Sequence, residues 1–379
     1  MFREQAHSQM KRPDSHNRRS VSPRRPPRIV QPQDDILNLL REKGVEAARR
    51  AQRGLIVQPG AIGDCILTLP LAALMKESLA LGSIDMLGHT QHIEILPGRS
   101  CIDSIRSIDT VDVHRLFVDP EKFELADHDP LISAFAEYSW IVTFLGEPHS
   151  HFEQNLIFTT NCSHSSEVLT LALKPPKDFT SHLMDFCRHQ FATQTGLSCE
   201  HPPANRNSRL IETTTADIRR GKELLGDLGL KADKGLIVIH PGSGSTKKCW
   251  HIENFLAVAK QLRSHGFDIV FLLGPAETER FDARTVSTLQ SVGQCVADLS
   301  LAEVLALFSC AHAFIGNDSG MTHLAGAIGL RTFAVFGPTS PTVYQPIGPL
   351  VTILKGDARR FAAGLSSRLQ DKIVTALLS

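Results

Sequence analysis

Two short apolar segments constrain the fold of this chain more than any other feature of its sequence. Residues 54–60 read GLIVQPG and residues 235–242 read GLIVIHPG, so each apolar run ends in a Pro-Gly turn. An apolar run without alternation is typical of a strand buried on both faces of a parallel sheet. Small residues and a helical pattern follow each run, so the sequence predicts two α/β lobes, each beginning at one of these strands.

Strand and helix patterns alternate along the rest of the chain, which predicts an α/β fold with doubly wound sheets. We expect the first lobe over residues 54–212, the second over 213–356 and a final helix over 357–379. In doubly wound sheets, ligands bind at the carboxyl ends of the strands. Candidate site residues are therefore expected in the turns that follow the apolar runs.

The first 53 residues differ in composition from the rest of the chain. Residues 1–33 hold eight Lys and Arg against two acids and few apolar residues, so this tail is expected to be disordered. Contact of the tail with nucleic acid or anionic lipid is the alternative to simple solvation. Residues 34–53 show a helical apolar pattern and are predicted to form an N-terminal helix packed on the body, with a membrane-surface helix as the alternative.

Composition limits which partners and which cellular location the sequence predicts. Lys+Arg and Asp+Glu both number 40, so the net charge indicates no particular partner, and no nucleic acid is expected. No apolar run is long enough to span a membrane, and the N-terminus lacks the apolar core of a secretory signal. The eight cysteines have no paired spacing and are expected to be reduced cytosolic thiols.

The first strand leads into a glycine-rich turn, Gly60-Ala-Ile-Gly63-Asp64. Glycines allow a ligand to approach the backbone closely. Two roles are open for Asp64, which begins the next helix: it can cap that helix, or it can accept a proton as a general base in a cleft. The spacing matches neither a Rossmann dinucleotide fingerprint nor a P-loop.

The turn after the second strand reads GSGSTKKCW and offers glycines, hydroxyls and lysines. Ser243 and Lys248 are candidates for a phosphate cradle, with an exposed flexible turn as the alternative. Trp250 is expected to pack on the following helix rather than to stack on a base. Glu277 follows a Gly-Pro turn, where a carboxylate can bind ribose hydroxyls or simply begin a helix.

Residues 315–341 pass from an apolar run through a polar turn into a helix, a geometry that suits an anion such as a phosphate. The candidate contacts are Asp318, Ser319, Gly320, Met321 and His323. His323 lies one helical turn further on, on the side of Ser319 and Gly320. A structural histidine is the alternative.

Together these segments resemble glycosyltransferase family 9, the ADP-heptose:lipopolysaccharide heptosyltransferases. The resemblance covers the chain from residue 54 onward and is carried by PGAIGDCILTLP (59–70), HPGSGSTKKCW (240–250), FIGNDSGMTHLAGAIG (314–329) and VFGPTSP (335–341). It implies a GT-B fold, with two Rossmann-like lobes facing across a cleft and the C-terminal helix crossing back to the first lobe. It also implies an inverting transfer from an ADP-sugar donor that uses neither a metal nor another cofactor.

The resemblance assigns roles to individual residues. It places the catalytic base on Asp64, the donor-phosphate lysine on Lys248 and a ribose-binding acid on Glu277. The remaining donor contacts are expected at Gly60, Gly63, Ser243, Asp318, Ser319, Gly320, Met321 and His323. The implied acceptor is a glycan or lipid-linked glycan of the cell envelope, such as lipopolysaccharide core. Such an acceptor implies a cytoplasmic protein, with peripheral contact at the cytoplasmic face of the inner membrane as the further alternative.

One feature departs from the family's pattern. Residues 82–160 hold only four Lys and Arg against thirteen Asp and Glu, a poor field for a phosphorylated acceptor. Either the acceptor is a less charged glycan or a protein, or the cations come from Arg206, Arg209 or the N-terminal helix. Two rival functions stay open, a catalytically silent ADP-sugar-binding module and a nucleotide-sugar epimerase. A carboxylate at Asp64 argues against the first, and no motif supports the second.

Overall fold

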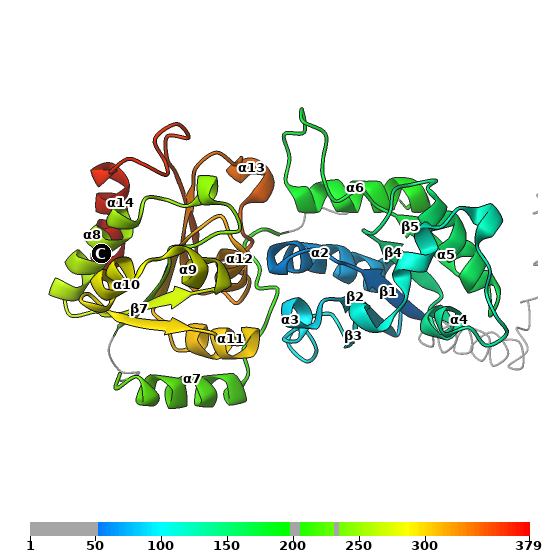
Figure 1. Ribbon diagram of the computed structural model, residues 1–379, viewed down its shortest axis with the longest axis horizontal. Helices are drawn as coiled ribbons and strands as arrows, with labels where there is room; N and C mark the ends of the chain where they lie inside the picture. Colours follow the sequence, from blue (N-terminus) through cyan, green and yellow to red (C-terminus); the bar gives the residue numbers. More distant parts are fainter. Residues whose placement is uncertain (1–51, 198–204, 231–234) are drawn as a thin grey trace, which may run out of the picture. The chain divides into compact units, whose positions relative to one another are not determined.

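The computed structural model describes residues 52–197, 205–230 and 235–379, all within the compact unit Ala47–Ser379. Two separate parallel sheets run through these residues (Figure 1). The strands of the first follow the order β3-β2-β1-β4-β5, and those of the second follow β11-β10-β9-β6-β7-β8. The expected α/β fold with doubly wound parallel sheets is therefore confirmed.

The first sheet is built around β1, the first of the two apolar runs. Its strands are β1 (Arg53–Val57), β2 (Ser83–Gly88), β3 (Ser104–Ser107), β4 (Trp140–Thr143) and β5 (Glu167–Thr170). The helices beside it are α2 (Ile62–Ser78), α3 (Thr90–Ile93), α4 (Pro130–Phe135), α5 (His151–Asn161) and α6 (Leu183–Thr195), with short 3-10 turns η1 (Ile108–Thr110), η2 (Val113–Phe117) and η3 (Pro120–Lys122). Leu55 packs with Phe135 and Phe152 on one face of the sheet. Ile56 packs with residues of α2 on the other, so β1 is buried on both faces as its sequence predicted.

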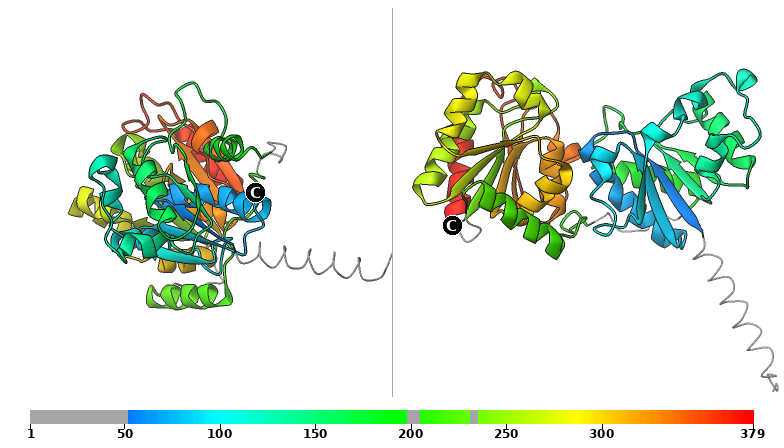
Figure 2. Two further views of the ribbon diagram at one scale, coloured as in Figure 1. Left: turned by 90° about the vertical axis from the view of Figure 1, so that its right-hand side faces the viewer. Right: turned by 60° about the horizontal axis from the view of Figure 1, so that its bottom comes forward.

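The second sheet repeats this plan around β6, the second apolar run. Its strands are β6 (Leu236–His240), β7 (Asp268–Leu273), β8 (Gln294–Ala297), β9 (Ala313–Asn317), β10 (Arg331–Phe336) and β11 (Val351–Lys355). Its helices are α7 (Thr215–Asp227), α8 (Ile252–Ser264), α9 (Pro275–Arg280), α10 (Ala283–Gln290), α11 (Leu301–Ser309), α12 (Gly320–Ala327), α13 (Pro341–Tyr344) and α14 (Ser367–Leu378), with the 3-10 turn η4 (Thr246–Lys248). Figure 2 shows helices on both sides of each sheet. The residues of β6 are all buried, which fits its central place.

The N-terminal expectations fall largely outside the described residues. The basic tail over 1–33 and residues 34–51 of the expected helix lie in the part that is not described. Arg53, expected at the end of that helix, is instead the first residue of β1. Its guanidinium lies 2.5 Å from the buried carboxylate of Asp85 and also pairs with Glu137. Arg53 is also in register with Ser83 of β2, so the strand begins one residue earlier than expected.

The boundary expected between residues 212 and 213 stays a prediction, but the next helix belongs with the second sheet. Gly221 of α7 packs so closely on α11 that a Cβ atom there would lie 2.2 Å from the Ala306 carbonyl oxygen. Only a glycine allows the two helices to approach in this way.

The C-terminal helix differs from its expected course in both its start and its contacts. It was expected to run over 357–379 and to cross back to the first lobe, but α14 begins at Ser367 and packs on α8 of the second sheet. Leu369 and Ile373 share an apolar cluster with Phe255 of α8. The buried Asn254 side chain accepts hydrogen bonds from the Ser366 backbone N–H at 2.8 Å and from Gln370 at 2.7 Å. The expectation was wrong because these contacts bury the apolar face of α14 on the lobe from which it emerges.

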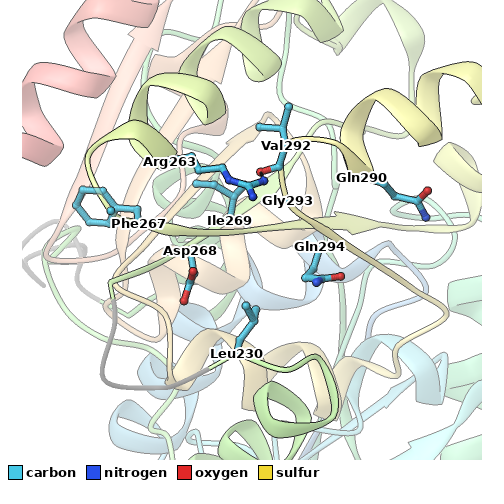
Figure 3. A pocket seen from close by; sticks show the side chains of 10 residues that line it. Leu230, Arg263, Phe267, Asp268, Ile269, Gln290, Val292, Gly293 and Gln294 are labelled. Carbon is cyan, nitrogen blue, oxygen red and sulfur yellow. Dashed lines mark hydrogen bonds between the residues drawn. The ribbon is translucent and has the colours of Figure 1, made fainter.

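No helix among the described residues is long and apolar enough to cross a membrane. A cavity of about 330 Å³ lies at the amino ends of β7 and β8 (Figure 3). Its lining includes Arg263, Asp268 and Gln294. Because ligands of doubly wound sheets bind at the opposite, carboxyl ends of the strands, this cavity is separate from the candidate site.

Candidate active site

The expected donor residues of the second lobe gather at the carboxyl ends of three adjacent strands. Ser243 follows β6, Glu277 follows β7 and Asp318 follows β9. In the sheet, β6 lies between β9 and β7, with His240 in register with Gly316. Parallel strands that lie side by side bring their following turns to one edge, so residues 75 positions apart in sequence meet: the Ser243 hydroxyl donates to the Asp318 carbonyl oxygen at 2.7 Å.

Asn317 at the end of β9 holds the turn after β6 through hydrogen bonds. The sequence reasoning missed this residue. Its side-chain oxygen accepts a hydrogen bond from the Trp250 backbone N–H at 2.8 Å, and its amide donates to the Pro241 carbonyl oxygen at 2.7 Å. Trp250 itself is buried and packs edge-on against Phe255 of α8, as expected. The turn after β6 is therefore fixed by the hydrogen bonds of Asn317 and by the packing of Trp250. A polar residue that ends an otherwise apolar strand was the signal that could have identified Asn317.

Lys248 and Asp318 form the charged centre of the cluster. The Lys248 ammonium lies 2.9 Å from Asp318 Oδ2, an ion pair without good hydrogen-bond alignment. Asp318 is 6% exposed and Lys248 36%, so the lysine forms the outer member of the pair. A cation held in this way by a buried carboxylate can turn its remaining protons toward an incoming phosphate.

His323 lies beside this pair and is neutral at physiological pH. Its Nε2 is 4.0 Å from Asp318 Oδ1. Burial lowers the pKa of His323 to about 4, although the Asp318 carboxylate opposes the shift. Among the described residues its buried Nδ1 has no hydrogen-bond partner. A neutral imidazole with an unused nitrogen can bind a ligand, so the ligand role and the structural role both stay open.

A second cation near Asp318 was also missed. Lys355 ends β11, where it is in register with Phe336 of β10, and Val335 of β10 is in turn in register with Asn317. Its ammonium donates to the carbonyl oxygens of Gly337 and Thr339, each at 2.6 Å. Burial lowers the pKa of Lys355, and Asp318 opposes the shift.

Glu277 is the third residue of α9 and is nearly fully buried, with 3% of its surface exposed. Its Oε2 accepts a hydrogen bond from the Gly274 backbone N–H at 2.9 Å, so it does act as a helix-start acid. Its buried Oε1 has no partner among the described residues. The carboxylate lies against Gly242, where a Cβ atom would be only 1.9 Å away. A carboxylate with one unpaired oxygen fits a ligand hydroxyl, and ribose binding stays a prediction.

Asp64 is the third residue of α2 and is partly buried. Its Oδ2 accepts a hydrogen bond from the Ala61 backbone N–H at 3.1 Å, which is the helix-capping role. Burial raises the pKa of Asp64, while the Ala61 N–H and the charge of Lys248 oppose the shift and Asp318 adds to it. A carboxylate with a raised pKa is a better proton acceptor, so the capping role does not exclude the role of a base.

The starts of α2 and α12 meet through two glycines. A Cβ atom on Gly63 would lie 3.0 Å from the His323 ring, and one on Gly320 would lie 3.0 Å from the Ile62 Cβ. A side chain at either position would push its neighbour away, so the two glycines allow the helix starts to approach closely. Ser319 shares a hydrogen bond of 3.2 Å with the Thr322 hydroxyl. The close approach places Asp64 beside the donor cluster.

Gly60 and Met321 complete the expected set. Gly60 packs under Asp64, because a Cβ atom there would lie 2.8 Å from the Asp64 carboxylate. Met321 is partly buried and packs against the apolar core. Donor contact of either residue stays a prediction.

Comparison with known proteins decides which family this site belongs to. The model of glycosyltransferase family 9 (heptosyltransferase) matches residues 156–366, which is more than half of the chain. The chain belongs to glycosyltransferase family 9.

Similar proteins and a similar solved structure support the assignment to this family. Lipopolysaccharide heptosyltransferase 2 of Salmonella typhimurium is 27% identical over 139 residues, which cover 35% of this chain but only 39% of that protein. Lipopolysaccharide heptosyltransferase 3 of Escherichia coli is 24% identical over 303 residues, covering 75% of this chain and 83% of that protein. The structure of E. coli heptosyltransferase WaaC with ADP superposes with a TM-score of 0.58 at 17% identity, covering 86% of this chain and 100% of that one. The two-sheet architecture is thus that of the GT-B heptosyltransferases, as expected.

Asp127-His-Asp129, a D-x-D sequence of the kind that binds metal ions in other proteins, lies outside this site, and its second aspartate has a structural role. Asp129 accepts two hydrogen bonds from Arg115, at 2.9 and 2.8 Å, and caps α4 through the Leu131 N–H at 3.0 Å. The Arg115 guanidinium lowers the pKa of Asp129 to about 2. A carboxylate committed to these partners has no free oxygen to offer a metal ion.

Proposed function

We propose that this family 9 protein transfers a heptose or related sugar from an ADP-sugar to a cell-envelope glycan such as lipopolysaccharide core. The proposed transfer inverts the anomeric centre and uses no metal ion. The names of the relatives support the donor and acceptor classes, and the structure of WaaC with ADP supports the nucleotide. We place the protein in the cytoplasm, with its lipid-linked acceptor reached at the inner membrane.

One observation carries the proposal more than any other. The partly buried Asp64 carboxylate, whose pKa is raised mainly by burial, lies within electrostatic reach of both Lys248 and Asp318. A proton acceptor on one lobe therefore faces a phosphate-binding cluster on the other. A transferase needs both in one site, whereas a module that only binds a nucleotide sugar needs the second alone.

On the donor side, the diphosphate binds between the start of α12 and the turn that holds Ser243 and Lys248. The unpaired N–H groups at a helix start and a lysine ammonium both favour negative charge. Glu277 accepts a hydrogen bond from the ribose through its unpaired Oε1. As the bond between the anomeric carbon and the diphosphate breaks, these fixed donors stabilise the charge that develops on the departing ADP.

On the acceptor side, Asp64 performs the proton transfer. The acceptor hydroxyl attacks the anomeric carbon from the face opposite ADP, so the new glycosidic bond has inverted configuration. Asp64 takes the hydroxyl proton as the bond forms, and ADP leaves with the electron pair of the broken bond. The raised pKa brings the basicity of the carboxylate closer to what this step requires.

The first lobe favours an acceptor region with little negative charge. Arg99 is paired with Asp217 at 2.7 Å, and Arg115 is paired with Asp129 at 2.8 Å. Arg106 donates to the Ala134 carbonyl oxygen. Three of the four basic residues in this acid-rich region are therefore committed to the fold, so we propose that the protein binds its acceptor through uncharged sugar hydroxyls rather than through phosphates.

An assay of ADP release tests the proposal directly. The protein is incubated with ADP-heptose, with and without a truncated lipopolysaccharide core, and the anomeric configuration of the product is read by NMR. We expect ADP release that depends on the acceptor, an inverted product and a rate unchanged by EDTA. ADP binding without release in the presence of any acceptor would identify a silent binding module, and a changed sugar without nucleotide release would identify an epimerase.

A further inference from the structure

His92 lies beside the turn that leads into α2 and Asp64, and the proposed mechanism gives it no role. It belongs to α3, which follows β2, the strand next to β1. Its Nδ1 lies 3.0 Å from the Gly60 carbonyl oxygen. A carbonyl oxygen can only accept a hydrogen bond, so Nδ1 carries the proton and donates it.

The carbonyl that His92 contacts is part of the peptide unit that also holds Asp64. The Gly60 C=O and the Ala61 N–H belong to one peptide group, and that N–H donates to Asp64 Oδ2 at 3.1 Å. Hydrogen bonds at the two ends of a peptide group polarise one another. A continuous path therefore runs from the imidazole through the peptide group to the carboxylate.

The position of this peptide group is fixed from its other side as well. The Gly60 N–H donates to the Gln58 side-chain oxygen at 3.0 Å, and the Gln58 amide donates to the Thr68 hydroxyl at 2.9 Å. Gln58 is fully buried. The loop is thus held at the Gly60 N–H by Gln58 and at the Gly60 carbonyl by His92, which directs the Ala61 N–H at Asp64.

We propose that His92 is a positioning residue that orients and polarises the Gly60–Ala61 peptide group, and thereby sets the basicity of Asp64. The inference rests on the proposed role of Asp64 as the base. His92 makes no contact with the reacting atoms in this scheme. Its hydrogen bond acts through the peptide group, beside the direct effect of its charge on Asp64.

The sign of the effect follows from the hydrogen bond. A hydrogen bond donated to the charged form of a carboxylate favours that form and lowers its pKa. Loss of the His92 donor weakens the Ala61 N–H as a donor, so the pKa of Asp64 should rise further above its ordinary value. The acidic limb of the activity profile should then move to higher pH, because a protonated Asp64 cannot accept a proton.

Other charged and titratable groups lie near Asp64 and His92, and they are the same in the wild type and in variants at position 92. Lys248 and Asp318 act on Asp64 from the second lobe, and Cys187 lies near it with a pKa raised to about 12 by burial. His89 packs edge-on against His92 at 5.7 Å and lies 3.4 Å from Asp109. The charge of His92 itself also lowers the pKa of Asp64 directly. Two variants that both lack the imidazole charge but differ in the hydrogen-bond donor therefore isolate the contribution of the hydrogen bond.

The test compares His92→Leu, which removes the donor, with His92→Asn, whose amide nitrogen replaces Nδ1. His149→Asn is the control, since that histidine side chain lies in the same lobe and is 96% exposed. Two measurements are made on the full-length chain: kcat/KM against pH with ADP-heptose, and the titration of the Asp64 carboxyl carbon by NMR without substrate. The Asp64 signal is assigned by its loss in Asp64→Asn.

We expect His92→Leu to lower kcat/KM several-fold more at pH 6 than at pH 8 and to move the Asp64 titration to higher pH. His92→Asn should show smaller changes than His92→Leu in both measurements, and the control should follow the wild type. A uniform loss of activity at all pH values with an unchanged titration would overturn the inference and leave His92 with a structural role. If His92→Leu does not fold, His92→Asn is compared with His92→Gln, whose amide replaces Nε2 and does not reach Gly60. Equal Asp64 titrations in these two variants would then overturn the inference about His92.

The outcomes also separate this inference from the proposed function. An active wild type with an unshifted titration in the variants refutes the role of His92 alone. If the wild type transfers no sugar but the Asp64 titration still shifts in His92→Leu, the proposed function is refuted and the hydrogen-bonded path from His92 to Asp64 is supported.

Discussion

At the scale of single residues, the site is a set of buried polar groups whose partners come from distant parts of the chain. Asp64 is held by the Ala61 N–H, and Asp318 is held beside Lys248 and His323. Each carboxylate has structural partners in the fold and, in addition, a proposed role in the transfer. Substitutions that keep shape but change one chemical property separate the structural task from the catalytic one.

Asp64→Asn removes the proton acceptor while an amide oxygen can still accept from Ala61. We expect transfer to fall by about 10²–10⁴-fold, the usual contribution of a general base. ADP affinity, measured by titration calorimetry, should change little because the donor cluster is intact. Asp112→Asn is the control, an exposed acid in the same lobe. Transfer by Asp64→Asn at the wild-type rate would show that the base lies elsewhere.

Lys248→Met removes the outer cation of the donor cluster and leaves Asp318 buried without its ion-pair partner. We expect ADP to bind about 10- to 100-fold more weakly, as for loss of a charge-assisted hydrogen bond of ~1.5–3 kcal/mol. Lys247→Met is a matched control, because the adjacent side chain carries the same charge but is exposed. An equal loss of ADP affinity in the two variants would mean that the overall positive charge of this turn, and not Lys248 in particular, determines ADP binding.

At the scale of elements, the structure depends on how helix ends are fixed. The start of α11 has a local signal in the sequence, because Ser300 and Glu303 have the spacing of a capping box and form one in the structure. The anchor of α14 was not readable, because the residue that holds it, Asn254, lies on α8. Its side chain connects the start of α14 with the preceding turn, to whose Gly364 carbonyl it donates at 3.0 Å.

Asn254→Ala should loosen α14 from the second sheet. The variant leaves the Ser366 N–H and the Gln370 amide without their acceptor, so we expect a loss of about 1–3 kcal/mol in the free energy of unfolding. Urea unfolding gives that loss, and hydrogen exchange should show faster exchange in α14. Lys260→Ala is the control, an exposed position on the same helix. A loss of stability without faster exchange in α14 would argue against the anchoring role.

At the scale of the whole molecule, two buried ion pairs make stability depend on pH. Arg115 lowers the pKa of Asp129 to about 2, and Asp217, with its pKa also lowered to about 2, is held by Arg99 and by the Thr214 N–H and hydroxyl. Both folded-state values lie below the ordinary 3.8, so the unfolded chain binds protons first as the pH falls. The stability that these pairs provide is therefore present above about pH 4 and lost between about pH 4 and pH 2.

Urea unfolding at pH 5, 4 and 3 measures this dependence. The free energy of unfolding should fall over this range in the wild type, and the fall should be smaller in Asp129→Asn, which no longer titrates at that position. Asp371→Asn, an exposed acid of α14, should keep the wild-type slope. An identical slope in Asp129→Asn would show that other groups cause the acid sensitivity.

The sequence by itself determined the fold class, the two central strands and the turns that carry the candidate site. These features depend on local patterns: apolar runs, Pro-Gly turns and glycines at fixed spacing, which act over a few residues. Family membership followed from the same segments. The acid-rich composition of residues 82–160 was also readable, but not that three of the four arginines and lysines in this region are committed to the fold.

Only the tertiary structure decided which distant groups meet. Asn317 contacts Trp250, and His92 contacts Gly60, across gaps that no local pattern spans. The course of α14 was misjudged for the same reason, since an apolar helix face does not specify which of several apolar surfaces will cover it. Hydrogen bonds and packing between separate elements are selected by the geometry of the folded sheets, and that geometry exists only once the whole chain has folded.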